Sequence, residues 1–217
     1  MKKSFVFAAL FSMILLSACN DNDDPQKSPT LLKIENTLNT QDTEIDLAAF
    51  LETAQKGVWK YEDICLFYTN GDMADEWTGG APVNYMSFQP NGKAKVFYWQ
   101  DFNPLISKYH YDEIEWSVNP QKPNTIELYS PYTEKTIKEW TSKGVKCDYA
   151  ARTTMELLYY QNGVFVMKGL QPYCHSGAAV DAGIYYDYCL FLGHIDTDEA
   201  TVNEYQSYPS IEELADN

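Results

Sequence analysis

The feature that most constrains the fold is a change in the spacing of the apolar residues after Gly57. Beyond this residue the chain consists of short β-rich runs, several of which alternate apolar and polar side chains, with turn signals between them. Asn162-Gly163 is the strongest of these signals, because Asn-Gly between two such runs is typical of a two-residue β-hairpin. About eight antiparallel strands joined by turns predict a β-barrel or a β-sandwich. The strands are expected over residues 58–68, 83–89, 93–100, 109–118, 125–130, 153–161, 164–170 and 184–195, with 200–205 as a further candidate and a loop through Gly79-Gly80.

One helix is expected before the strands, over residues 43–55. Asp42 or Thr43 can cap its start, and Gly57 can end it in a left-handed conformation. The apolar residues of this segment fall three and four positions apart and form one stripe. The stripe consists of Leu47, Phe50, Leu51 and Ala54.

Gly57-Val58-Trp59 directly follows this helix and opens the first expected strand. A G-x-W pattern in this position resembles the lipocalins and the wider calycin families. Gly57 allows a sharp turn from helix to strand, and Trp59 brings a large apolar area. The resemblance implies that Trp59 packs across the closed end of an up-and-down barrel and that the short helix covers this end. We therefore expect an all-β, lipocalin-like antiparallel barrel of about eight strands with one N-terminal helix.

Residues 1–18 have the pattern of a secretory signal peptide. Two lysines precede an apolar run from Phe5 to Leu16, which is shorter than the roughly 20 residues of a transmembrane helix. Small residues follow, and Leu16-Ser17-Ala18-Cys19 resembles the lipobox of bacterial lipoproteins. The resemblance implies cleavage before Cys19 and acylation of Cys19, which would anchor the protein in a membrane. The alternative is an ordinary signal peptide in which Cys19 is incidental.

Residues 19–42 are expected to be the lipidated N-terminus and a flexible tether, because they are polar and contain Pro25 and Pro29. The acidic run at 20–24 resembles the export signal that sends some lipoproteins to the outer face of the outer membrane. The alternative is a plain hydrophilic spacer. We expect a lipid-anchored outer-membrane protein with one barrel domain over 43–208 and an acidic tail over 209–217.

The charge of the chain argues against nucleic acid as a partner. Without residues 1–18, 14 basic residues stand against 31 acidic ones, so the net charge is −17. Binding to a phosphate backbone needs clustered lysines and arginines, and Arg152 is the only arginine. The sequence carries no indication of the oligomeric state.

The chain lacks the sequence motifs of the common catalytic and cofactor sites, including G-x-S-x-G, the P-loop, the dinucleotide fingerprint and H-E-x-x-H. The histidines, His110, His175 and His194, are too far apart for a local zinc motif. The acidic loop at 196–199 lacks the spacing of a calcium-binding loop and is interpreted as solvated. We therefore expect no metal, no cofactor and no catalysis.

Aromatic residues supply the candidates for ligand binding. Phe97 and Trp99 share one side of an expected strand, and Tyr186 and Tyr188 share one side of the last long strand. One interpretation is dense packing on one side, with tyrosine hydroxyl groups in solvent on the other. The other is a barrel interior lined for a flat or apolar ligand.

Four cysteines remain if Cys19 is acylated, in a compartment where disulfides persist. Cys147 and Cys174 flank the open end of the Asn162-Gly163 hairpin, where antiparallel pairing brings the flanking segments together. We expect a disulfide between Cys147 and Cys174. Cys65 and Cys189 lie inside the first and last long strands and are interpreted as buried thiols.

Two functions are expected from these patterns, and an enzyme is the third alternative, which a buried polar cluster around His110 or His194 would favour. The first is a lipid-anchored protein whose lipocalin-like barrel binds a small apolar or glycan-derived ligand without catalysis. The second is a structural or accessory surface protein whose barrel is filled by its own side chains and holds no small ligand.

Overall fold

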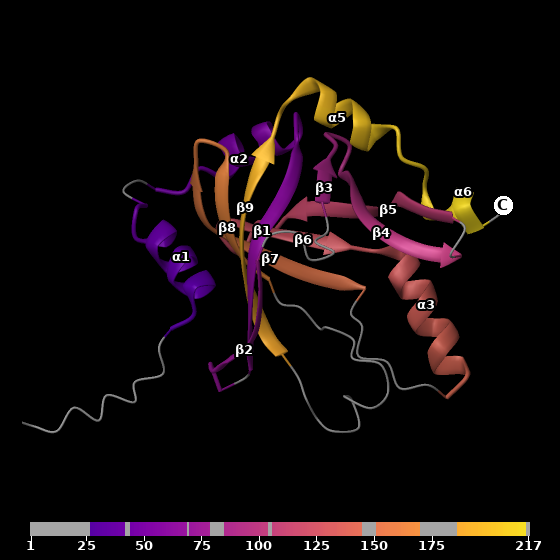
Figure 1. Cartoon of the computed structure of the whole chain (residues 1–217), viewed down its shortest axis with the longest axis horizontal. Coiled ribbons are helices and arrows are strands. Elements are labelled where there is room, and N and C mark those ends of the chain that lie inside the picture. Colours follow the sequence, from indigo (N-terminus) through magenta and orange to yellow (C-terminus); the bar gives the residue numbers. More distant parts are fainter. Residues whose placement is uncertain are drawn as a thin grey trace, which may run out of the picture.

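The computed structural model describes residues 27–41, 44–68, 70–78, 85–103, 106–144, 151–169 and 186–215. These residues form nine antiparallel strands in one sheet that closes on itself (Figure 1). The prediction of a mostly antiparallel β fold is therefore confirmed. The strands are β1 Val58–Tyr68, β2 Met73–Thr78, β3 Tyr85–Phe88, β4 Lys93–Asn103, β5 Ile106–Val118, β6 Thr125–Tyr129, β7 Arg152–Gln161, β8 Val164–Gly169 and β9 Tyr186–Asp196.

The ring is closed by β1, which pairs with β9 along its whole length. β2 and β3 both pair with β1 as well, β2 along Asp63–Phe67 and β3 at Trp59. Because β9 occupies one edge of β1, β2 and β3 must share the other edge. The nine strands thus take eight positions around the ring, and β2 forms in a segment where no strand was expected.

The expectation of a single helix is wrong, because the described residues contain five. In Figure 1, α1 lies to the left of the strands, α3 at the lower right and α5 at the top. The helices are α1 Pro29–Leu38, α2 Leu47–Ala54, α3 Pro131–Ser142, α5 Glu199–Gln206 and α6 Ile211–Ala215.

Four of the described helices, α1, α2, α3 and α5, begin after a residue whose side chain caps the first turn. Ser28 precedes Pro29 at the start of α1, and Ser130 precedes Pro131 at the start of α3. In both cases the serine oxygen accepts a backbone N–H of the first turn, and proline suits the first helical position. Helix α1 therefore occupies part of the segment expected to be a flexible tether.

The candidate strand at 200–205 is wrong, because this segment belongs to α5. Asp198 caps the helix and accepts the backbone N–H of Thr201 at 3.0 Å. Val202 and Tyr205 lie three residues apart, which places both on the helix face that packs against the ring.

Helix α2 is shorter than the expected 43–55 and begins after Asp46, whose carboxylate accepts the backbone N–H of Ala49 at 2.9 Å. Gly57 does not adopt the expected left-handed conformation. It is instead required by close packing, since a Cβ atom there would lie 2.6 Å from the backbone oxygen of Asp196.

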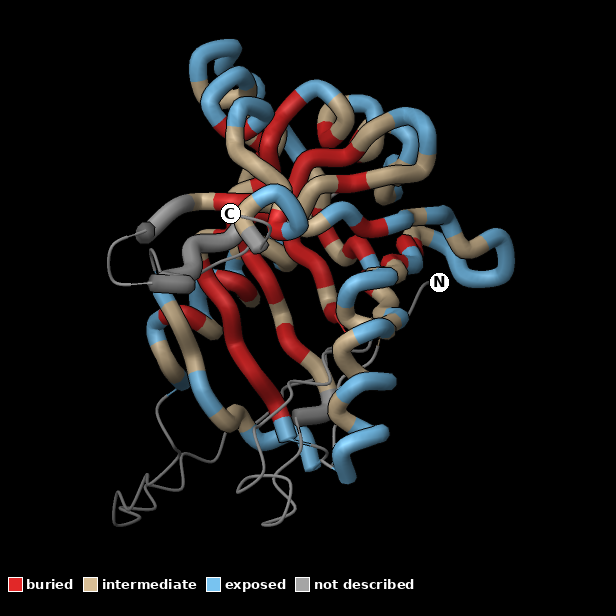
Figure 2. Tube along the Cα trace, turned by 90° about the vertical axis from the view of Figure 1, so that its right-hand side faces the viewer, coloured by how far each residue is buried: buried red, intermediate tan, exposed pale blue. Residues whose placement is uncertain are grey.

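The interior of the ring is packed with apolar side chains from α2 and the strands. Trp59 is fully buried there; its ring stacks on Phe88 at 4.6 Å between centroids and meets the edge of Phe50 from α2 at 5.1 Å. Figure 2 shows buried residues running along the strands, whereas exposed residues gather in helices and turns. Helix α2 thus covers the end of the ring that contains Trp59.

Candidate functional site

Two of the four aromatic ligand candidates have described side chains, and the structure does not bring them together. Phe97 is fully buried with Val58 and Tyr205 beneath α5. Tyr188 stacks on Phe67 at 4.6 Å, in the apolar cluster beneath α1. Both clusters lie on the outside of the ring, since the neighbouring positions on β4 and β9 fill the interior. The side chains of Trp99 and Tyr186 lie outside the described residues.

Of the five cysteines, two lie among the described residues and three do not. Cys19, Cys147 and Cys174 lie outside the described residues. Cys65 and Cys189 are free and buried, as expected. Although β1 and β9 are neighbours, Cys189 faces the interior and Cys65 faces α1, so the two thiols point to opposite sides of the sheet. Burial raises the pKa of Cys65 to about 12, which makes this thiol a poor nucleophile at neutral pH.

Ionisable side chains inside the ring occur on β5. His110 is buried, and Asp112 follows on the same side of the strand, where it accepts a hydrogen bond from the Ser130 hydroxyl at 3.0 Å. Burial raises the pKa of Asp112 to about 6. The described residues contain no group of three His, Cys, Asp or Glu side chains placed to hold a metal ion.

An open groove of about 770 Å³ lies outside the ring, between α1 and the β7–β8 hairpin. One wall is the exposed side of α1, and the other is the outer face of the hairpin around the Asn162-Gly163 turn. The lining residues are Pro29, Leu32, Lys33, Asn36, Thr37 and Thr40 from the α1 side, with Tyr159, Gln161, Asn162 and Val164 from the hairpin.

A β-bulge in β1 creates the polar anchor for α1. Tyr61 is opposite Gly193 of β9 and Asp63 is opposite Leu192, so Glu62 is the extra residue. The bulge shifts the alternation of side chains, and consecutive residues Glu62 and Asp63 both contact side chains outside the ring.

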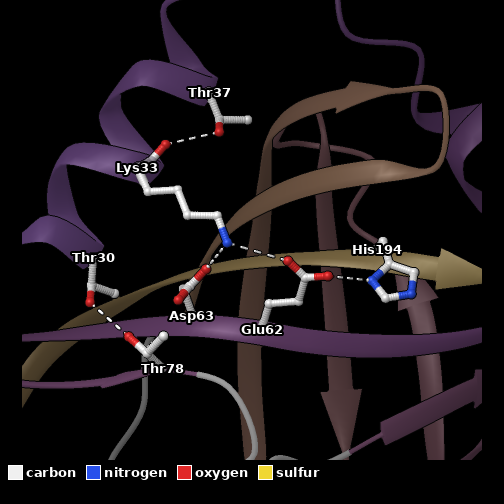
Figure 3. A network of polar contacts seen from close by, with 7 residues as sticks. All are labelled: Thr30, Lys33, Thr37, Glu62, Asp63, Thr78 and His194. Atoms are coloured by element: carbon white, nitrogen blue, oxygen red, sulfur yellow. Dashed lines mark hydrogen bonds and ion pairs between the residues drawn. The ribbon is translucent and has the colours of Figure 1, made fainter.

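Lys33 connects α1 to this bulge (Figure 3). Its Nζ lies 2.5 Å from Asp63 Oδ2 and 3.5 Å from Glu62 Oε2, and Glu62 Oε1 lies 2.8 Å from His194 Nδ1 on β9. Asp63 is only 1% exposed, so Lys33 supplies the charge that compensates a buried carboxylate. The hydrogen bond to Asp63 raises the pKa of Lys33, which keeps the ammonium charged.

We expect Lys33→Met to lower the free energy of unfolding by about 2–3 kcal/mol, because it leaves the Asp63 carboxylate buried without its cation. The matched control is Lys27→Met, which removes the exposed pair with Glu35 and should cost less than about 1 kcal/mol. Urea unfolding would measure both. Equal effects of the two substitutions would contradict the claim that Lys33 compensates the buried Asp63 carboxylate, whereas a partial rescue of Lys33→Met by Asp63→Leu would support it.

The remainder of α1 is held by apolar packing and by side-chain hydrogen bonds near its C-terminal end. Ile34 is fully buried against β1, β7, β8 and β9. The Thr40 hydroxyl lies 3.3 Å from the Tyr159 hydroxyl, which donates to Gln161 Oε1 at 3.1 Å. Gln41 Oε1 accepts the backbone N–H of Tyr160 at 3.3 Å. The α1 wall and the hairpin wall of the groove are thus both held in place by contacts with the strands of the ring.

The sequence-based prediction of the site missed this groove, because residues 19–42 were assigned to the tether. A local signal was present: Ser28-Pro29 marks a helix start, and Leu31, Ile34 and Leu38 form an apolar stripe at helical spacing. No local signal could place this helix against the β7–β8 hairpin.

Among the described residues, none of the helices is both long enough and apolar enough to span a membrane. Comparison with protein-family models finds no match to the chain, and comparison with curated proteins finds none either.

Proposed function

We propose that the protein is a lipid-anchored outer-membrane protein that binds a small apolar or glycan-derived ligand without catalysis. The observation that carries this proposal is the groove between α1 and the β7–β8 hairpin. Its volume of about 770 Å³ falls within the range of small-molecule sites, about 300–1,000 Å³. Its walls are tied to the ring by the ion pair between Lys33 and the buried Asp63 carboxylate and by an apolar cluster, which reduces the entropy that binding would remove.

A lipocalin-like barrel is the form of the fold that we propose. Three observations support it: the eight positions around the ring, the pairing of the first strand with the last, and the buried Trp59 beneath α2. The ligand site that we propose differs from that expected from the aromatic pattern, because it lies outside the ring.

Binding without catalysis is supported by the chemistry of the groove. Lys33 and Tyr159 are the two ionisable residues among those that line it. Lys33 is occupied by Asp63 and Glu62, and the Tyr159 hydroxyl is occupied by Gln161. Neither is free to act as an acid or a base on a ligand.

The lipid anchor would place this groove near the membrane. Pro29 lies ten residues after Cys19, and an extended chain of this length spans at most about 36 Å. A Cys19→Ala variant should lose acyl labelling and leave the membrane fraction. Unchanged partition into membranes would refute the anchor and leave the groove proposal standing.

Native mass spectrometry of the protein purified from its own cells would test ligand binding. We expect a copurifying small molecule on the wild-type protein and its loss in Asn36→Trp, which fills the groove from the exposed side of α1. Asn203→Trp is the matched control, because Asn203 is an exposed helical asparagine on α5. A ligand that persists in Asn36→Trp would refute the groove as its site.

An accessory role without a small ligand is the second candidate. The interior cluster favours it, because aromatic and aliphatic side chains from α2 and the strands pack against one another inside the ring. Absence of any copurifying molecule from the wild-type protein would favour this candidate over the first.

A further inference from the structure

We infer that the groove between α1 and the β7–β8 hairpin takes an uncharged oligosaccharide. The inference rests on the proposed function and names the class of its ligand. Three properties of the groove lead to it: the balance of its charges, the hydrogen-bonding groups on its walls, and the exposed apolar surface beside them.

The charges of the groove favour an uncharged ligand. Among the described residues its lining contains no carboxylate, so a cationic ligand would find no counterion in the lining itself. The single lining ammonium, on Lys33, already contacts Asp63 at 2.5 Å and Glu62 at 3.5 Å, so an anionic ligand would compete with two carboxylates of the protein. The net charge of −17 without residues 1–18 repels anionic ligands further.

The hydrogen-bonding groups of the groove favour a ligand rich in hydroxyl groups. Three primary amides line it: Asn36 on the α1 wall, and Gln161 and Asn162 on the hairpin wall. In the described part of the chain, the Asn36 and Asn162 side chains form no hydrogen bond, and Gln161 uses only its oxygen, toward Tyr159. A free amide offers two N–H donors and one carbonyl acceptor, which match neighbouring sugar hydroxyl groups. A purely apolar ligand would instead bury these groups without partners.

Exposed apolar surface completes the site. Leu32 is 41% exposed, although it is a large apolar side chain, and it lines the groove with Pro29 and Val164. Sugar rings present C–H groups as well as hydroxyl groups, so they can cover this surface while the amides bind their hydroxyl groups. The groove is open rather than enclosed, so a short chain of linked sugar units can extend beyond its ends.

Titration calorimetry would test the inference with four probes: neutral oligosaccharides of glucose, neutral oligosaccharides of N-acetylglucosamine, an oligogalacturonate of similar length, and dodecanoate. We expect at least one neutral oligosaccharide to bind, and oligogalacturonate and dodecanoate to bind at least tenfold more weakly. Asn36→Ala and Asn162→Gly should each weaken the neutral probe by about threefold to tenfold, the effect of one lost hydrogen bond. Glycine suits position 162, where φ is +52°.

The control is Asn203→Ala on α5, which should leave the affinity unchanged. Failure of every neutral oligosaccharide to bind would overturn the inference, as would affinities that neither amide variant reduces. The oligosaccharide class can be refuted without refuting the proposed function. A copurifying apolar molecule that Asn36→Trp removes would preserve small-ligand binding in the groove and refute only the oligosaccharide class.

Discussion

Replacing Trp59 with alanine should lower the free energy of unfolding by about 3–5 kcal/mol. Trp59 is fully buried, and its ring contacts Phe50, Phe88 and Phe165 with centroid separations of 4.6–5.1 Å. Alanine would leave a cavity between α2 and the ring, because these neighbours belong to different elements and cannot all move inward. Urea unfolding monitored by far-ultraviolet circular dichroism would measure the loss.

Tyr132→Ala is the control for this substitution. Tyr132 is 42% exposed on α3, and its truncation should change the free energy of unfolding by less than about 0.5 kcal/mol. Similar values for the two variants would mean that Trp59 does not hold α2 against the end of the ring.

Gly193→Ala should destabilise the protein by at least about 3 kcal/mol. A Cβ atom at this position would lie 2.3 Å from the backbone oxygen of Lys60 and 2.9 Å from Phe165 Cζ. The aromatic ring can shift, but the backbone oxygen belongs to β1 at the pairing that closes the ring. The substitution must therefore separate β1 from β9 locally. Thermal unfolding and amide hydrogen exchange along these two strands would show the effect.

Two comparisons make the Gly193 result specific. The double variant Gly193→Ala/Phe165→Leu should recover little stability, because it relieves only the side-chain contact. Gly71→Asn should be tolerated, since Gly71 has φ +88° in an exposed turn, no described residue beyond its chain neighbours has an atom within 4 Å of the added Cβ, and asparagine accepts left-handed conformations. Full recovery in the double variant would show that the backbone contact does not limit the substitution.

The strands and turns could be predicted from the sequence because their causes are local. β1 has its predicted limits, and the Asn162-Gly163 turn has the two positive φ angles, +52° and +82°, of a tight hairpin. Side-chain alternation and turn residues act over a few positions, so they specify an element before any distant part of the chain is in place. The capping signals of α1, α3 and α5 are equally local, and at 200–205 the Asp198 cap outweighs the short strand-like pattern.

Bulges in β1 and β7 decide which side of the ring several residues face, and simple alternation of apolar and polar residues does not reveal them. The bulge at Glu62 places two consecutive acidic residues on the outside of β1. A register shift between Leu157 and Tyr159 has the same effect on β7, where Leu158 and Tyr159 both join the outer cluster. A bulge arises from the pairing of two strands and cannot be seen in the sequence of one strand. Simple alternation along that strand therefore assigns the residues beyond the bulge to the wrong side of the sheet.

The sequence by itself determined the strand-rich architecture, the main hairpins and the burial of Cys65 and Cys189. The tertiary structure decided how the ring closes, which aromatic residues lie outside it, and where the groove forms. The groove depends on contacts between residues far apart along the chain: Thr40 and Tyr159 meet across 119 positions, as do Gln41 and Tyr160. Such contacts form only when closure of the ring brings β7 and β8 beside α1. The local sequence of α1 does not specify that it packs against this hairpin, and the local sequence of the hairpin does not specify that it packs against α1.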